Sequence, residues 1–232
     1  MSKLHTATRL DGHRVLITQA DTFMGPAFCE GFAACGAEVI ADTRALADDP
    51  QAPAAMVAEA GHVDALVIHL ALPAPSTLAG DVTDDEWRAV FAAMVDPMPR
   101  LLAAVLPQMR ERGSGNVLVI GSAGALRGQK RTASYSAARG AQLAWVRSVG
   151  LELAPLGVRV NAIAQNFVDN PTYFGPEVQA NPRFQERLKR EVPLGRLVAP
   201  HEDALFAAYL CSPAAACFVG QVFPVCGGWV QG

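Results

Sequence analysis

Residues 14–41 read RVLITQADTFMGPAFCEGFAACGAEVIA, and this stretch decides the fold class. The apolar run Arg14–Thr18 has the length and composition of a buried strand. Residues 24–35 are helical in pattern and are followed by Gly36, a common residue at a helix end. A second apolar run, Glu38–Ala41, comes directly afterwards. A strand, a helix and a strand in this order predict a βαβ unit whose strands are parallel.

The same alternation continues along the whole chain. We expect the helix that begins at Thr83 to open with a capping box to Glu86, and to be kinked or interrupted by Pro97, Pro99 and Pro107. The pattern predicts an α/β fold: a Rossmann-like, doubly wound parallel sheet flanked by helices on both faces, in a single domain over residues 1–232. The remaining predicted strands are 64–70, 116–121, 158–164 and 221–225, and the remaining predicted helices are 53–60, 83–109, 132–154, 176–190 and 200–211.

Composition excludes several classes of protein. Hydrophobic residues make up 51% of the chain and charged residues only 18%, which excludes a disordered chain. The net charge of −3 argues against nucleic-acid binding. No uninterrupted apolar run reaches the roughly 18 residues of a membrane span, and residues 1–14 contain no apolar segment typical of a secretory signal. We therefore expect a soluble, cytoplasmic protein with neither a nucleic-acid nor a membrane partner.

Cysteine and histidine usage argues against disulfides and metal sites. The five cysteines are odd in number, contain no Cys-x-x-Cys and lie in apolar surroundings, so we expect them to be small buried side chains. The five histidines are never at ligand spacing, so we expect no metal site. The cysteines are Cys29, Cys35, Cys211, Cys217 and Cys226, and the histidines are His5, His13, His62, His69 and His201.

The turn after the first strand lacks most of the glycines that a dinucleotide requires. Glycines at this place let the backbone approach the pyrophosphate at the helix N-terminus. Here the turn contains Gln19 and Phe23, whose side chains would occupy the phosphate path, and Asp21 adds a negative charge. A dinucleotide is thus disfavoured on three grounds. Asp42 follows the second strand, where a ribose-binding carboxylate would lie, but without the glycine turn we interpret it as a solvated surface residue.

Three polar residues form a candidate catalytic set. Ser122 follows a predicted strand, at the sheet edge where active sites collect. Tyr135 and Arg139 are four residues apart on a predicted helix and therefore share a face. A fixed cation beside a phenol favours the phenolate, and a serine hydroxyl can position a substrate oxygen. A Tyr–Arg pair one turn apart also occurs by chance, so the pair gains significance only from its fixed distance to Ser122.

These residues carry a resemblance to a known family. Ser122-x12-Tyr135-x3 is the spacing of the short-chain dehydrogenase/reductase superfamily, and the resemblance covers nearly the whole chain. Dehydrogenases of that superfamily have Lys where Arg139 stands and a glycine-rich turn where residues 18–25 stand. The patterns Ser-x12-Tyr-x3-Arg and Thr18-x4-Phe23-x-Gly25 instead resemble the halohydrin dehalogenases.

The resemblance implies an activity and a set of site residues. It implies cofactor-independent, reversible conversion of vicinal halohydrins to epoxides with release of halide and a proton, and epoxide opening by cyanide, azide or nitrite. Ser122, Tyr135 and Arg139 would be catalytic. Loops 72–77, 124–130 and 170–176 would wall the pocket. The implied halide-binding residues are Phe23, Ala164, Gln165, Asn166, Phe167 and Val168.

Two other functions stay open, and the resemblance also implies an assembly. One alternative is an NAD(P)-dependent short-chain oxidoreductase with a degenerate turn. The other is a non-catalytic binding member of the same superfamily. The superfamily assembles through its long helices, here those containing Trp87 and Trp145, so we expect a homotetramer.

Overall fold

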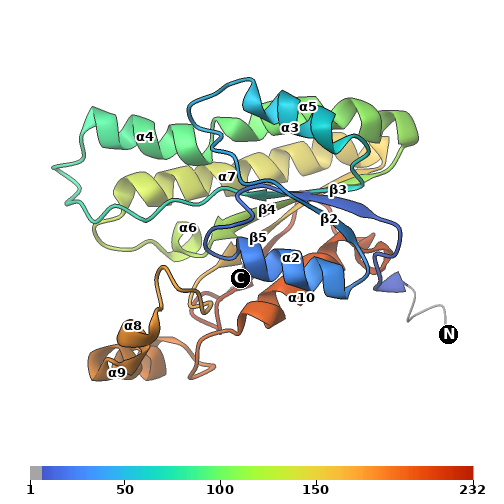
Figure 1. Cartoon of the computed structure of the whole chain (residues 1–232). Coiled ribbons are helices and arrows are strands. Elements are labelled where there is room, and N and C mark those ends of the chain that lie inside the picture. Colours follow the sequence, from blue (N-terminus) through green and yellow to red (C-terminus); the bar gives the residue numbers. More distant parts are fainter. Residues whose placement is uncertain (1–6, 232) are drawn as a thin grey trace.

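The computed structural model describes residues 7–231. Within them, six parallel strands form one sheet in the order β2-β1-β3-β4-β5-β6 (Figure 1). The predicted doubly wound parallel sheet is confirmed. The strands are β1 (Arg14–Ile17), β2 (Glu38–Ala41), β3 (Ala65–His69), β4 (Gly115–Ser122), β5 (Val158–Gln165) and β6 (Val222–Val225).

Helices cover both faces of this sheet. Helices α3, α4, α5 and α7 lie on one side, and α2 and α10 lie on the other (Figure 1). The pair α8 and α9 lies beyond one end of the sheet. The helices are α2 (Gly25–Ala34), α3 (Ala52–Ala60), α4 (Asp84–Met94), α5 (Pro97–Arg112), α6 (Gly124–Arg127), α7 (Ala133–Leu153), α8 (Pro176–Ala180), α9 (Pro182–Glu191) and α10 (Pro200–Cys211), with short 3-10 turns at Ala154–Leu156 and Pro213–Ala215.

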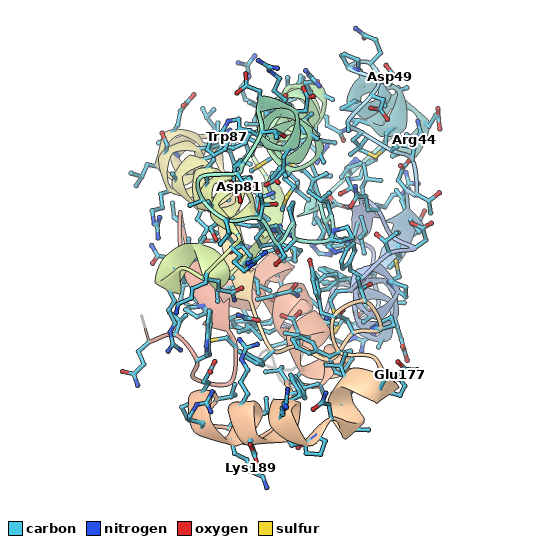
Figure 2. The ribbon with its side chains drawn as sticks, turned by 90° about the vertical axis from the view of Figure 1, so that its left-hand side faces the viewer. Arg44, Asp49, Asp81, Trp87, Glu177 and Lys189 are labelled. Atoms are coloured by element: carbon cyan, nitrogen blue, oxygen red, sulfur yellow. The ribbon has the colours of Figure 1, made fainter. Side chains whose placement is uncertain are left out.

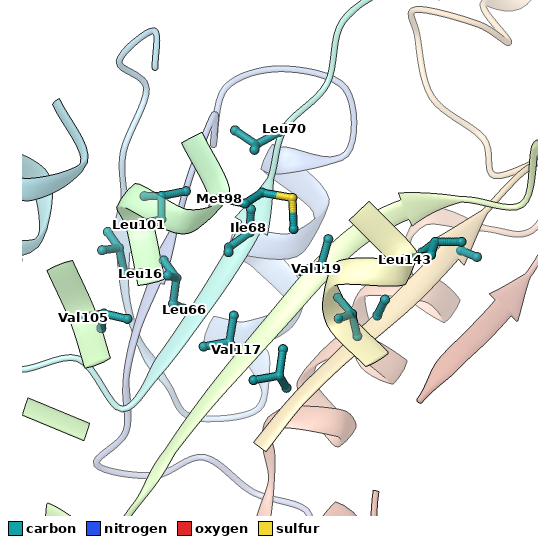
Figure 3. Packing of buried hydrophobic residues seen from close by; sticks show 14 of the residues in the cluster. Leu16, Leu66, Ile68, Leu70, Met98, Leu101, Val105, Val117, Val119 and Leu143 are labelled. Atoms are coloured by element: carbon teal, nitrogen blue, oxygen red, sulfur yellow. The ribbon is translucent and has the colours of Figure 1, made fainter. Parts of the chain in front are cut away.

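Alternate residues of the strands build a core on each face. On the α5 and α7 side, Leu66, Ile68 and neighbouring strand residues pack against Leu101 of α5 and Leu143 of α7 (Figure 3). Each such buried side chain stabilises the fold by roughly 1.5–3 kcal/mol. On the other face, the helices α2 and α10 pack closely. A Cβ on Gly31 would lie only 2.6 Å from the Cβ of Ala204, so this contact requires a glycine.

Two predicted helices are each split in two at a proline. The expected interruption at Pro97 is confirmed: the predicted helix 83–109 becomes α4 and α5, because the backbone N of Pro97 carries no hydrogen to continue the helix. Pro107 lies inside α5, which continues past it. The predicted helix 176–190 becomes α8 and α9, since Pro182 disfavours a helical backbone at Asn181, whose ψ is 120°.

The predicted capping box at the start of α4 is only half correct. The Thr83 side chain accepts a hydrogen bond from the Glu86 amide at 3.1 Å. The Glu86 carboxylate instead accepts hydrogen bonds from the hydroxyls of Thr77, at 2.6 Å, and Ser134. Glu86 thereby ties the loop after β3 to the first turn of α7, the turn that carries Tyr135.

The stretch Asp84–Arg112 is long and apolar enough to cross a membrane by length and composition alone. In the structure it is divided between α4 and α5, and Leu101 and Val105 of α5 lie in the core against the sheet. Charged residues such as Asp96 and Arg100 interrupt this stretch, so it contains no uninterrupted apolar run of membrane-spanning length.

The cysteines agree only in part with the prediction. All five are free; Cys211 and Cys226 are buried, and Cys29 and Cys35 are half-buried. Cys217 is exposed, so the prediction that it is buried is wrong. Among residues 7–231, no group of three or more His, Cys, Asp or Glu side chains is arranged to hold a metal ion.

Candidate active site

A cavity of about 310 Å³ lies at the carboxyl ends of β1, β3, β4 and β5. The strand order reverses between β1 and β3, and ligands of open α/β sheets bind outside the strand ends at such a point. The lining residues are Phe23, Met24, His69, Ala71, Ala74, Ile120, Gly121, Ser122, Gln129, Tyr135, Arg139, Gln165, Asn166, Phe167, Val168, Asn170, Tyr173, Phe174, Val178, Phe184 and Arg187.

The three predicted catalytic residues all line this cavity. Ser122 is the last residue of β4, and its hydroxyl accepts a hydrogen bond from the Gly124 amide at 3.1 Å. Tyr135 lies in the first turn of α7, and Arg139 lies one turn later. The guanidinium carbon of Arg139 is 5.1 Å from the centre of the Tyr135 ring. The arrangement therefore places a permanent cation beside the phenol.

Arg139 is held in this position by groups that the sequence did not identify. Its Nη1 donates hydrogen bonds to the carbonyl of Ile120 at 2.9 Å and to the side-chain oxygen of Gln142 at 3.0 Å. Gln142 in turn donates to the carbonyl of Met94 at 2.6 Å, at the end of α4. Gln142 lies three residues after Arg139 on the same helix, so this spacing was a signal that could have been used.

The turn between β1 and α2 keeps a glycine-like backbone but carries side chains. Gln19 and Phe23 both have a φ of 47°, in the left-handed region that favours glycine. The Gln19 side chain accepts a hydrogen bond from the Ala71 amide at 2.8 Å, and the Phe23 ring lines the cavity. Only Gly25 remains: a Cβ there would lie 2.5 Å from the Gln19 carbonyl. Two positions of the turn that favour glycine therefore carry side chains, and one of these, Phe23, lines the cavity.

Asp42, at the end of β2, is not the solvated surface residue that was expected. It is buried, and its carboxylate is 2.8 Å from Nε of Arg44 and accepts a hydrogen bond from the Arg44 amide. Arg44 follows Asp42 by only two residues in the sequence, but the sequence does not show the local bend that brings the two side chains together.

Five of the six predicted halide-binding residues line the cavity. Gln165, Asn166, Phe167 and Val168 line it, together with Phe23, whereas Ala164 is buried within β5. Phe167 has a left-handed backbone, with a φ of 51°, and its amide donates to the side-chain oxygen of Asn166 at 2.9 Å. We call residues 165–168 the anion turn, after the halide-binding role predicted for them; the Asn166 amide donates to the Val225 carbonyl at 3.1 Å.

His69 and Tyr173 are further lining residues whose ionisation the structure controls. Burial lowers the pKa of His69 to about 4, so its imidazole is neutral near pH 7. Burial raises the pKa of Tyr173 to about 12, so its phenol keeps its proton. That phenol donates to the Leu72 carbonyl at 3.2 Å and accepts from the Ala74 amide at 3.0 Å. Tyr173 therefore joins two of the three loops expected to wall the pocket.

Behind the anion turn lies a buried carboxyl group, Asp203 of α10. The Gln165 side-chain amide donates to one of its oxygens, and the other oxygen has no hydrogen-bond partner among residues 7–231. Burial raises the pKa of Asp203 from its ordinary value of 3.8 to about 7. The sequence shows only an acidic residue near the start of a helix, so its burial could not be foreseen.

Replacing Asp203 with Asn should change how stability depends on pH. Because the carboxyl binds its proton more tightly in the folded state, its contribution to stability is present below about pH 4 and is lost as pH rises through about 7. Asn keeps the acceptor for Gln165 and does not ionise. The difference in melting temperature, Asp203→Asn minus wild type, should therefore be more positive at pH 8 than at pH 5. An equal difference at both pH values would contradict the assigned ionisation.

Comparison with known proteins places the chain in a family. The family model described as Enoyl-(Acyl carrier protein) reductase matches residues 5–230. Galactitol 2-dehydrogenase (L-tagatose-forming) of Cereibacter sphaeroides is 32% identical over 97% of each chain. The chain therefore belongs to the short-chain dehydrogenase/reductase superfamily, and most of the proteins that it resembles are oxidoreductases.

Solved structures give two kinds of neighbour. One, described as a dehalogenation enzyme, is 34% identical, with a TM-score of 0.88 over 95% of this chain and 99% of the other. Another, 7α-hydroxysteroid dehydrogenase complexed with NADH and 7-oxo glycochenodeoxycholic acid, is 26% identical, with a TM-score of 0.88 over 100% of this chain and 99% of the other. A dehalogenation enzyme and a dehydrogenase therefore share this fold, so the activity has to be inferred from the residues of the site.

Proposed function

We propose that this protein is a halohydrin dehalogenase, which converts vicinal halohydrins to epoxides without a cofactor and opens epoxides with small anions such as cyanide, azide and nitrite. One observation carries the proposal: the Phe23 ring enters the cavity that also contains Ser122, Tyr135 and Arg139. The catalytic phenol is thus retained, while the turn that would bind a dinucleotide is filled with side chains. The similarity to a dehalogenation enzyme supports the same assignment.

The chemistry follows from the positions of the three catalytic residues. The substrate hydroxyl lies between the Ser122 hydroxyl and the Tyr135 oxygen. The Tyr135 oxygen takes the hydroxyl proton, and the cation of Arg139 stabilises the phenolate that does so. The substrate oxygen then attacks the neighbouring carbon: a C–O bond forms, the C–X bond breaks, and halide leaves with the bonding electron pair. Because both groups belong to one molecule, the displacement gains from proximity.

The leaving halide is assigned to the space between Phe23 and the anion turn. The ring edges of Phe23 and Phe167, which both line the cavity, carry partial positive charge and so stabilise an anion. Stabilisation placed where charge develops lowers the barrier to C–X cleavage. The neutral Tyr173 phenol and neutral His69 nearby add no negative charge to oppose the halide.

The deciding experiment is halide release from 1,3-dichloro-2-propanol by the purified protein with no cofactor added. We expect release that is unaffected by NAD(P)H, and no NAD(P) copurifying with the protein. The second candidate, an NAD(P)-dependent oxidoreductase, is favoured by the identity to galactitol 2-dehydrogenase. Saturable NADH binding in a fluorescence titration, without halide release, would select it. The absence of both activities would favour a non-catalytic binding member.

Halides should inhibit the reaction as products, and bromide should inhibit more strongly than chloride because it is less strongly hydrated. Phe23→Ala should raise the inhibition constant of bromide and lower turnover together, since the ring serves both the bound halide and the departing one. Phe32→Leu, in the core between α2 and the sheet, is a control for general loosening of α2. Unchanged bromide inhibition in Phe23→Ala would remove Phe23 from the halide site.

The expected homotetramer is also a proposal, supported by exposed apolar side chains on the two long helices. Trp87 of α4 is 43% exposed and Leu151 of α7 is 73% exposed. Sedimentation analysis should give four chains per particle. Trp87→Lys should reduce that number if α4 lies in the interface.

A further inference from the structure

A second hollow, of about 730 Å³, adjoins the outer end of the active-site cavity. The two share Gln129 and Arg187, so a substituent that leaves the cavity between these residues enters the hollow. Its walls come from the segment around α6, from α9 and from the C-terminal Trp229. The reaction proposed above uses none of its other residues.

The walls of this hollow carry a concentrated positive charge. They contain four cations, Arg127, Lys130, Arg187 and Arg190, and one carboxylate, Glu191, which leaves three formal positive charges. The whole chain has a net charge of −3, so the charge of this hollow is opposite in sign to that of the whole chain. Clefts lined by one sign of charge concentrate ligands of the opposite sign.

Two of the cations are fixed in place by aromatic rings. The Arg127 guanidinium lies 4.7 Å from the Trp229 ring centre and donates to the Trp229 carbonyl at 2.8 Å. The Arg187 guanidinium lies 5.4 Å from the centre of the Phe167 ring, in the anion turn, and pairs with Glu191 at 3.1 Å. Arg190 also pairs with Glu191, at 2.9 Å. Positive charge is therefore present both in the hollow, on Arg190, and beside Phe167, at the end of the cavity to which the halide is assigned.

We propose that this hollow binds an anionic group, a carboxylate or a phosphate, attached to the halohydrin or epoxide that reacts in the cavity. This inference rests on the proposed dehalogenation. With the substrate hydroxyl at Ser122 and Tyr135 and the halogen at the anion turn, the remaining substituent extends past Gln129 and Arg187 into the hollow. The halide assigned to the cavity does not require four cations outside it.

Matched substrate pairs test the proposal. One pair is 4-chloro-3-hydroxybutanoate and its methyl ester; the other is 3-chloro-2-hydroxypropyl phosphate and 3-chloro-1,2-propanediol. The anionic member of at least one pair should have a kcat/KM about tenfold above its neutral partner. The pair with the larger ratio identifies carboxylate or phosphate as the preferred group. Equal values within both pairs would overturn the proposal and leave the dehalogenase assignment intact.

Variants show whether the hollow causes the preference. The double variant Lys130→Gln with Arg190→Gln should bring the ratio of kcat/KM values close to one. Turnover of the neutral substrates should be unchanged, because neither side chain lines the active-site cavity, although Lys130 lies in a loop expected to wall it. Lys189→Gln is the matched control, since this exposed lysine of α9 points away from the body of the molecule (Figure 2). An unchanged ratio in the double variant, or an equal loss in Lys189→Gln, would contradict the proposal.

A binding measurement separates this inference from the proposed reaction. Calorimetry with 2,3-dihydroxypropyl phosphate and with glycerol measures binding alone, because neither compound can undergo the proposed reaction. The phosphate should bind more tightly than glycerol, and the double variant should weaken its binding about tenfold. No halide release from any substrate, combined with this binding pattern, would overturn the dehalogenase assignment and retain the anion site. Equal binding of both probes would overturn the anion site.

Discussion

Tyr135→Phe should reduce halide release by about 10³-fold, because it removes the only atom of the side chain that can accept the substrate proton and keeps the ring. The ring contacts that involve Arg139 remain possible, so the fold should be intact. The measurement is the initial rate of halide release from 1,3-dichloro-2-propanol, with the melting temperature measured alongside.

Ser122→Ala should produce a loss of similar size, of about 10²–10³-fold, since the hydroxyl that positions the substrate oxygen is removed. Tyr209→Phe is a matched control, because Tyr209 on α10 lies outside the cavity lining. If Tyr135→Phe retained most of the activity, another group would have to accept the proton, and the assigned roles would be wrong.

Arg139→Lys should lower turnover by about 10- to 100-fold, although the charge is conserved. The Arg139 fork reaches the Ile120 carbonyl and Gln142 with one nitrogen while its plane lies over the Tyr135 ring. A lysine ammonium is a compact point charge on a flexible stem and cannot keep all of these contacts. An oxidoreductase of this superfamily should instead gain from the change, since Lys is its usual residue.

Gln142→Leu provides a second test of Arg139, since it removes a hydrogen-bond partner of the guanidinium without changing its charge. Turnover should fall and KM should change little. Unchanged turnover in Gln142→Leu would mean that this contact does not position Arg139.

Much of the fold could be predicted because hydrophobic periodicity is local information. The apolar runs in β1, β3, β4 and β5 are buried on both faces, and such runs indicate parallel strands regardless of what packs on them. The prolines predicted the interruption at Pro97, but the split before Pro182 and the continuation of α5 past Pro107 were not predicted. A helix continues past a proline only where its packing offsets the missing backbone hydrogen bond, and the surrounding structure decides this.

The sequence by itself determined the chemical identity of the site. The spacing of Ser122, Tyr135 and Arg139, and the replacement of two turn glycines by Gln19 and Phe23, can be read directly from the chain. A residue's place at a strand end or on a helix face follows from regular geometry, so these residues were expected to converge, and all five are found around the carboxyl ends of the central strands.

Only the tertiary structure decided which distant groups support and enclose that site. Gln142 reaches Met94, Tyr173 reaches Leu72 and Ala74, and Asp203 is buried behind Gln165. The hollow beside the cavity likewise joins residues of α6, α9 and the C-terminal segment. Such contacts join residues far apart in sequence, and burial, which sets the ionisation of Asp203 and Tyr173, is a property of the packed molecule rather than of any segment of its chain.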